Sequence, residues 1–289
     1  MTGSNKGIGL AIVKALLDNH ADTFVYLCSR VKENGETAMA SIKQENKDRL
    51  QLLVLDVNSD ESVRAARETL GPIKLYGLVN NAGIATGSPD ELINTNYYGA
   101  KRVIDNFIDL IDGGKIVSIS SGSAPMFLEK CSPEKKRMMI DPAIEMSTID
   151  QYIKDFKYLY SDGGVDACKA AGWGDDGLSY GYGFSKACLN ALTVCVARER
   201  KGICITAASP GLVLTDLFLP VAKKQGVEIE ELAKQWGHIQ PSESVVSTMK
   251  LLFDDSVTSG LYYGSDGLRS PMSFYRKPGS DEYDGSNGL

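Results

Sequence analysis

Two residues one helical turn apart, Tyr182 and Lys186, are the strongest candidates for chemistry in this chain. On a helix, side chains four positions apart project from one face, so the phenol and the ammonium would be neighbours. A free phenol has a pKa of about 10, and a nearby ammonium lowers that pKa. Tyr182 is therefore predicted to donate a proton to a substrate oxygen. Tyr180 does not share the spacing, and simple packing on a helix surface is the alternative for the pair.

A serine follows the apolar run that begins at Lys115. Ser121 stands at the carboxyl end of this predicted strand, where its hydroxyl can hydrogen-bond a carbonyl oxygen as negative charge develops there. Ser120 competes for this role, whereas Ser118 is expected to face away. An ordinary turn-forming serine is the alternative.

The chain opens on a glycine-rich turn that leads into a predicted helix. Glycines allow backbone N–H groups to approach a pyrophosphate closely, and the helix N-terminus adds partial positive charge. A flexible terminus is the alternative, because the pattern starts at residue 2. The predicted phosphate-binding residues are Gly3, Ser4, Asn5, Lys6, Gly7, Ile8 and Gly9.

No strand precedes this glycine turn, although a dinucleotide-binding loop should follow a buried central strand. Either the sequence starts at an internal methionine of a longer protein, or the chain lacks that strand; we favour the first. Without the strand, two neighbouring strands would be left with unpaired backbone edges, each buried unpaired group costing about 1–3 kcal/mol.

The choice of cofactor is predicted from a residue about 20 positions beyond the loop, where NAD-binding folds carry an acid that accepts from the ribose 2′-OH. This chain has Arg30 there. An arginine binds a 2′-phosphate in a bidentate manner, and Lys6 adds a second positive charge. NADPH/NADP⁺ is therefore the predicted cofactor.

Composition excludes several classes of function. The formal net charge of −6 argues against nucleic-acid binding, which needs a concentrated basic surface. No apolar run approaches the roughly 20 residues needed to span a bilayer, and the start of the chain does not resemble a signal peptide. Six scattered cysteines and two histidines give no metal-ligand spacing, so no metal is expected and the cysteines are interpreted as free thiols in the cytoplasm.

Short apolar runs alternate with longer amphipathic stretches, which predicts βαβ units around a buried parallel sheet. The fold class is α/β: a Rossmann-type doubly wound parallel sheet in three α/β/α layers, within one domain, with its first strand missing. The predicted strands are Thr23–Cys28, Gln51–Leu55, Leu75–Val79, Lys115–Ile119 and Ile203–Ala207. The predicted helices are Ile8–Asp18, Asp60–Thr69, Asp90–Ile111 and Tyr182–Glu199.

Five motifs in order, each weak alone, resemble the classical short-chain dehydrogenase/reductase family. They are the glycine turn, Asn80-Asn81-Ala82-Gly83, Ser121, Tyr182-x-x-x-Lys186 and Ser209-Pro210-Gly211. The resemblance extends from Thr2 to about Tyr263. The long segment before Tyr182, together with 95–99 and 131–134, is similar to the monomeric NADPH-dependent carbonyl reductases.

The resemblance implies a role for further residues. It selects Ser121 over Ser120, and it assigns Asn96 to a water that links Lys186 to solvent; a surface asparagine is the alternative. Tyr182 and Lys186 would also touch the cofactor. Asp56 and Val57 would contact the adenine, Asn80, Asn81, Ala82 and Gly83 would line the adenosine side, and Pro210, Gly211, Val213 and Thr215 would hold the nicotinamide amide.

One cofactor-binding domain is expected over residues 1–276, with an insertion at about 122–178 and a flexible tail over 277–289. In oligomeric members of the family the helices flanking this region form the subunit contact, so an added helix predicts a monomer. Leu217–Gln240 is the expected substrate lid, with Phe218, Leu219 and Trp236 available for apolar contacts. Met126, Phe127 and Trp173 either line the substrate cleft or pack in the core.

The leading hypothesis is NADPH-dependent reduction of small-molecule carbonyl compounds (aldehydes, ketones or quinones) to alcohols by hydride transfer. Two alternatives stay open: a reductase dedicated to one specific ketone, and a catalytically silent NADP-binding or interaction protein. The missing strand favours the silent protein, whereas the set Asn96, Ser121, Tyr182 and Lys186 opposes it.

Overall fold

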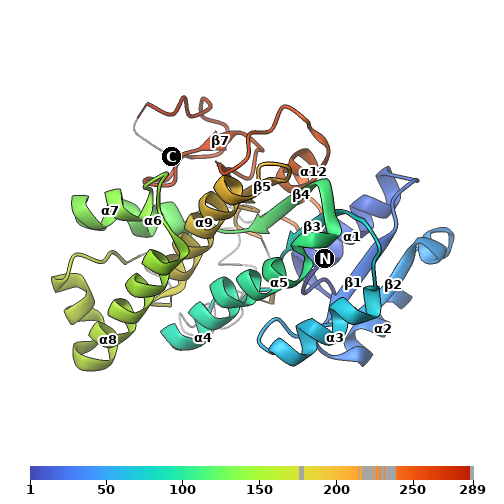
Figure 1. Cartoon of the computed structure of the whole chain (residues 1–289), viewed down its shortest axis with the longest axis horizontal. Coiled ribbons are helices and arrows are strands. Elements are labelled where there is room, and N and C mark those ends of the chain that lie inside the picture. Colours follow the sequence, from blue (N-terminus) through green and yellow to red (C-terminus); the bar gives the residue numbers. More distant parts are fainter. Residues whose placement is uncertain are drawn as a thin grey trace.

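The computed structural model describes residues 1–175, 179–213, 215–216, 223, 226, 228, 231 and 239–286 of the 289-residue chain. Its strands form two adjoining groups, ordered β1-β2 and β3-β4-β5-β6-β7 (Figure 1). Neighbouring strands are parallel except for the last pair, β6 and β7. The strands are β1 (Val25–Ser29), β2 (Leu50–Val54), β3 (Leu75–Asn80), β4 (Ile111–Ile119), β5 (Cys204–Ala208), β6 (Tyr262–Tyr263) and β7 (Arg269–Ser270).

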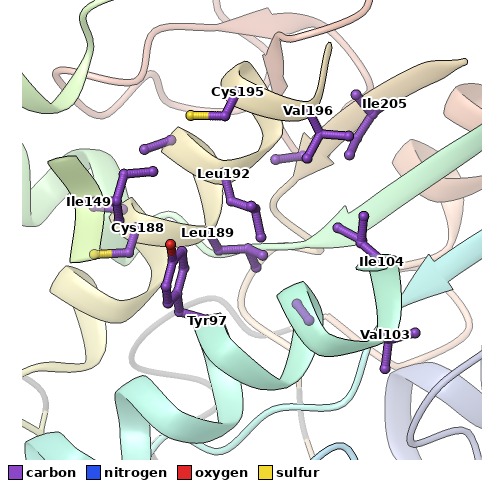
Figure 2. Packing of buried hydrophobic residues seen from close by; sticks show 14 of the residues in the cluster. Tyr97, Val103, Ile104, Ile149, Cys188, Leu189, Leu192, Cys195, Val196 and Ile205 are labelled. Atoms are coloured by element: carbon purple, nitrogen blue, oxygen red, sulfur yellow. The ribbon is translucent and has the colours of Figure 1, made fainter. Parts of the chain in front are cut away.

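Helices cover both faces of the sheet, because buried side chains of each central strand alternate between two apolar clusters. Ile116 of β4 packs in the larger cluster with α5 and α9, whereas Val117 packs on the other face with α1 and α12. Figure 2 shows part of the larger cluster, to which Leu189 and Leu192 of α9 and Ile104 of α5 belong. The helices are α1 (Gly7–Asn19), α2 (Lys32–Ala40), α3 (Asp60–Leu70), α4 (Pro89–Ile93), α5 (Gly99–Phe107), α6 (Ser123–Glu129), α7 (Pro133–Met139), α8 (Met146–Ala170), α9 (Tyr182–Glu199) and α12 (Val246–Phe253).

This three-layer α/β arrangement confirms the predicted fold class. All five predicted strands are found, and the observed carboxyl end of each lies within two residues of the predicted one. The predicted helix Asp90–Ile111 is found as consecutive helical segments, in which the π-helical turn Asn94–Tyr98 lies between α4 and α5 without a gap. Its last predicted residue, Ile111, begins β4 instead. The helices α2 and α12 and the short strands β6 and β7 were not predicted.

The first four residues link the two groups of strands. The N–H of Cys28 in β1 donates to the Met1 carbonyl at 3.0 Å, and the N–H of Thr2 donates to the Val79 carbonyl of β3 at 3.0 Å. The N–H of Ser4 returns to the Cys28 carbonyl at 2.9 Å. At this end of β1 and β3, Met1–Ser4 therefore pairs with both strands, while β1 and β3 stay in the two separate groups that a missing central strand predicts.

The segment between Ser121 and Tyr182 folds into α6, α7 and α8 (Figure 1). Helix α8 bends at Gly163 and Gly164, and Gly164 takes a positive φ of 63°. Phe156 of α8 stacks on Phe184 of α9, with ring centroids 4.1 Å apart. Lys157 of α8 also forms an ion pair with Asp90 of α4. The segment thus covers the outer side of α9 and α4.

Phe127 and Trp173, expected either in a substrate wall or in the core, are buried in the larger cluster. Within the polar tail, Tyr283 is also buried, and its N–H donates to the Arg269 carbonyl at 3.1 Å. The predicted lid residues Phe218, Leu219 and Trp236 lie outside the described residues. Among the helices that the structure describes, none combines the length and apolar character needed to cross a membrane.

Candidate active site

The catalytic candidates Tyr182 and Lys186 lie on the first turns of α9 and are both buried. Gly181 precedes the helix at a φ of 98°, and a Cβ there would stand 3.2 Å from Pro89 Cβ, so this turn favours glycine. Tyr180 does not point with them, because its ring stacks on Phe156 at 5.5 Å between centroids. The structure therefore separates the two tyrosines as the spacing predicts.

Lys186 lies in a buried position beneath the end of β4. Its Nζ donates to the Ile119 carbonyl at 2.8 Å. Burial lowers the pKa of this ammonium to about 8, because removal from water disfavours the charged form. A Cβ on Gly83 would lie 3.3 Å from Lys186 Nζ and 3.0 Å from Asn96 Oδ1, so the lysine and the asparagine approach the same glycine.

Asn96 lies in the π-helical turn Asn94–Tyr98 and is buried. Its Nδ2 donates to the Ile84 carbonyl and to Ser185 Oγ, each at 2.9 Å, and its Oδ1 accepts the Ile84 N–H at 2.9 Å. These bonds tie the loop after β3 to α9. Single π turns frequently occur at functional sites, because they re-aim one side chain within an otherwise regular helix. Asn96 is thus not the surface residue of the alternative interpretation.

Of the three serines near the end of β4, Ser118 and Ser120 are buried, and their hydroxyls have no hydrogen-bond partner among the described residues. Ser121 is half-buried. Its Oγ accepts the Ser123 N–H at 3.1 Å, which leaves its own hydrogen available for a substrate oxygen.

Tyr262 of β6 is a residue that the sequence reasoning missed. Its hydroxyl donates to the Ser121 carbonyl at 3.1 Å. Burial raises the pKa of this phenol, as do the neighbouring phenols of Tyr275 and Tyr182, so it stays protonated and can donate. No sequence signal pointed to Tyr262, because the pairing of the two-residue strand β6 beside β5 has no local signature.

The glycine loop is held against the segment after β3. Thr2 Oγ1 accepts the N–H groups of Asn81 and Ala82, each at 3.0 Å. Asn81 Nδ2 donates to the carbonyls of Thr2 at 3.0 Å and Gly3 at 2.9 Å. Gly3 has a φ of 58°, and a Cβ there would stand 2.9 Å from Ala82 Cα. The close approach of the two segments therefore requires glycine.

A cleft of about 580 Å³ opens beside this loop, at the carboxyl ends of the strands. The N-terminus of α1 borders it, and the first turn of α1 has no acidic residue that would repel a phosphate. These features, with Arg30 exposed at the rim, fit a dinucleotide phosphate. Of the predicted cofactor residues, the cleft brings together Gly3, Asn5, Lys6, Gly7, Ile8, Gly9, Arg30, Asp56, Val57, Asn81, Ala82, Gly83 and Thr215.

Other predicted cofactor residues do not line this cleft. Ser4 is buried, and its hydroxyl accepts the Cys28 N–H at 3.0 Å instead. Asn80 is buried, and its amide has no hydrogen-bond partner among the described residues. Val213 is also buried and pairs with Ile239 in an isolated bridge. The residues that line the cleft also do not include Pro210, Gly211, Tyr182 or Lys186.

Lys6 is paired with an acid that the sequence reasoning did not consider. Its Nζ lies 3.0 Å from Asp216 Oδ2, and the two side chains are 67% and 65% exposed. Both residues border the cleft, one from the glycine loop and one from the segment after β5. A 2′-phosphate that binds Lys6 therefore competes with Asp216.

Comparisons with known proteins identify the family of this chain. The family described as short chain dehydrogenase matches residues 1–132. Carbonyl reductase (NADPH) 1 of Mus musculus is 31% identical over 252 residues, which cover 79% of this chain and 86% of the relative. The chain belongs to the short-chain dehydrogenase family.

Two solved structures with a similar fold are plant reductases. Salutaridine reductase of Papaver somniferum is 25% identical with a TM-score of 0.72, covering 91% of this chain and 97% of its own. Menthone neomenthol reductase of Mentha piperita is 23% identical with a TM-score of 0.74, covering 92% and 97%, and shows the fold alone.

Proposed function

We propose that this short-chain dehydrogenase reduces aldehydes, ketones or quinones to alcohols with NADPH, and that Tyr182 is the general acid. The general class, an NADP-dependent oxidoreductase that acts on carbonyl compounds, follows from the family and from the relatives named carbonyl reductase. The single observation that carries the finer assignment is the buried pair at the start of α9, Tyr182 and Lys186, in which Lys186 bonds the carbonyl at the end of β4.

NADPH supplies a hydride to the substrate carbon when it is bound in the cleft. Tyr182 donates its phenolic proton to the carbonyl oxygen, and Ser121 stabilises the developing negative charge with its O–H. The ammonium of Lys186 favours the phenolate that remains on Tyr182. Asn96, which lies beside Lys186 across Gly83, would hold the water through which a proton from solvent reaches Lys186 and restores the phenol of Tyr182.

Arg30 and Lys6 are the proposed partners of the 2′-phosphate. Arg30 is exposed directly after β1 and borders the cleft, where its planar fork can bind two phosphate oxygens. Lys6 is in reach of the same cleft but must first leave Asp216. Pro210, Gly211, Val213 and Thr215 are proposed to hold the nicotinamide amide, although only Thr215 borders the cleft.

We further propose that the protein is a cytoplasmic monomer with one cofactor-binding domain. Helix α8 supports this proposal, because its contacts through Phe156 and Lys157 cover α9 and α4, the helices that would otherwise meet a second subunit. The six cysteines are free thiols, five of them buried, as expected for a reducing compartment.

The test is NADPH oxidation at 340 nm by the full chain, with a quinone and an aromatic aldehyde as substrates and NADH as comparator. Tyr182→Phe is expected to lower kcat at least about 100-fold, the usual contribution of a general acid. NADPH affinity should change less than about twofold, because the phenol acts on the substrate oxygen.

Tyr180→Phe is the matched control, since its ring belongs to the aromatic cluster with Phe156 and should leave kcat near the wild-type value. If Tyr182→Phe keeps most of its rate, Tyr182 is not the acid. If the wild type binds NADPH but reduces no carbonyl compound, the silent NADP-binding protein replaces the proposal.

A further inference from the structure

The short C-terminal strands bring a second tyrosine, Tyr275, to the end of β4. A Cβ on Gly122 would stand 2.9 Å from Tyr275 Cε2 and 3.4 Å from its Cδ2, so the ring lies directly on Gly122. Gly122 follows Ser121, whose carbonyl accepts the Tyr262 hydroxyl. The Ser121–Gly122 segment is therefore in contact with Tyr262 on the buried side and with Tyr275 on the outer side.

Tyr275 is exposed over 37% of its surface, although hydrogen bonds hold its backbone N–H and the side chain of the next residue. Its N–H donates to Glu129 Oε2 of α6 at 3.4 Å. The next residue, Arg276, is buried and bonds Ser270 Oγ at 2.9 Å and the Ser280 carbonyl at 2.7 Å, and it also pairs with Asp266. An anchored backbone thus holds an aromatic ring in water beside the predicted catalytic serine.

We propose that Tyr275 is a specificity-determining residue that forms an aromatic wall of the substrate site and favours carbonyl compounds with a planar ring. An exposed ring that is already ordered loses little conformational freedom when a second ring packs on it, so the contact yields net affinity. Its closeness to Ser121 puts the wall within one residue of the group that would bind the carbonyl oxygen. This inference rests on the proposed carbonyl reduction and on the role of Ser121 in it.

The experiment compares 4-nitrobenzaldehyde with butanal as substrates of the full chain, at saturating NADPH. Aromatic pairs contribute about 0.5–1.5 kcal/mol beyond area burial, which corresponds to a factor of about 2–12 in KM. Tyr275→Leu keeps an apolar contact with Gly122 but removes the ring. It is expected to raise KM for 4-nitrobenzaldehyde about fivefold relative to KM for butanal, whereas Tyr275→Phe should keep the wild-type KM ratio.

Tyr158→Leu is the matched control, because Tyr158 is a 68% exposed tyrosine on α8. Melting temperature and NADPH affinity verify that each variant is folded. An unchanged KM ratio in Tyr275→Leu would overturn the proposal, as would an equal rise in KM for both aldehydes, which indicates a merely structural ring.

A binding measurement separates this proposal from the proposed function. Benzamide and acetamide are unreactive amides that differ in a planar ring, and calorimetry gives their affinities for the NADPH complex. Tyr275→Leu should weaken benzamide about fivefold and acetamide less than twofold, even if the wild type reduces neither aldehyde. Equal weakening of both amides, or of neither, contradicts an aromatic wall at Tyr275.

Discussion

Replacing the buried Lys186 by methionine tests the electrostatics of the site without any substrate. Burial lowers the pKa of this lysine from 10.5 to about 8. The native state therefore releases its proton at lower pH than the unfolded chain. Between about pH 8 and pH 10.5 the unfolded state binds more protons, so the free energy of unfolding rises with pH. Below about pH 8 both states are protonated, and the whole cost of burying the charge is present.

The full difference corresponds to about 3 kcal/mol, at 1.36 kcal/mol for each unit of pKa. Over the accessible range from pH 7 to pH 9.5, wild type should gain about 2 kcal/mol in the free energy of unfolding relative to Lys186→Met. Packing differences between lysine and methionine cancel, because they contribute equally at both pH values.

Urea unfolding followed by circular dichroism, in reducing buffer without cofactor, measures this difference. Lys14→Met is the matched control, because Lys14 is exposed on α1 and its replacement removes the same charge. Its stability should follow the wild-type pH dependence. If Lys186→Met also follows the wild-type curve, the ammonium of Lys186 keeps its solvation in the native state, and the argument that its burial tunes the site is refuted.

Two further predictions concern the cofactor and are measured by fluorescence titration with NADPH and NADH. Arg30→Asp should raise the Kd for NADPH at least about tenfold and leave that for NADH nearly unchanged, since charge-assisted hydrogen bonds contribute about 1.5–3 kcal/mol; equal weakening of both cofactors would rule out Arg30 as the 2′-phosphate ligand. Asp216→Asn should lower the Kd for NADPH about two- to fivefold by releasing Lys6 from an exposed ion pair of about 0–1 kcal/mol. A weaker NADPH complex would instead indicate that the pair of Lys6 and Asp216 supports the bound cofactor.

Much of the fold was predictable because parallel strands and their helices leave strong local patterns. The five predicted strands are short runs rich in apolar residues, and α9 was predicted with its observed bounds Tyr182–Glu199. The π turn at Asn94–Tyr98 was not predictable in the same way. A π turn preserves the apolar periodicity on both sides and differs from a regular helix by a single residue, which periodicity does not detect.

The spacing motifs identified the site better than they identified the neighbours of each residue. Tyr182 and Lys186 follow from a spacing within one helix. By contrast, Tyr262 and Tyr275 reach Ser121 and Gly122 only because β6 pairs with β5 and the chain then returns. Such contacts join residues more than a hundred positions apart and depend on tertiary packing. The ion pair of Asp216 with Lys6 could not be predicted for the same reason, since nothing near Asp216 in sequence indicates Lys6.

The glycine loop shows how the first residues of the chain are positioned by segments that follow much later. Backbone bonds from Cys28 and to Val79 fix Met1 and Thr2 between two strands. Thr2 and Asn81 then bond in both directions, so the loop and the segment after β3 hold one another at the distance that only Gly3 permits. Two positions after Asn81 stands Gly83, the glycine that Lys186 and Asn96 both approach. The segment Asn81–Gly83 therefore fixes the position of the glycine loop at one end and borders Lys186 at the other. This shared segment sets the position of the cofactor cleft relative to Tyr182 and Lys186.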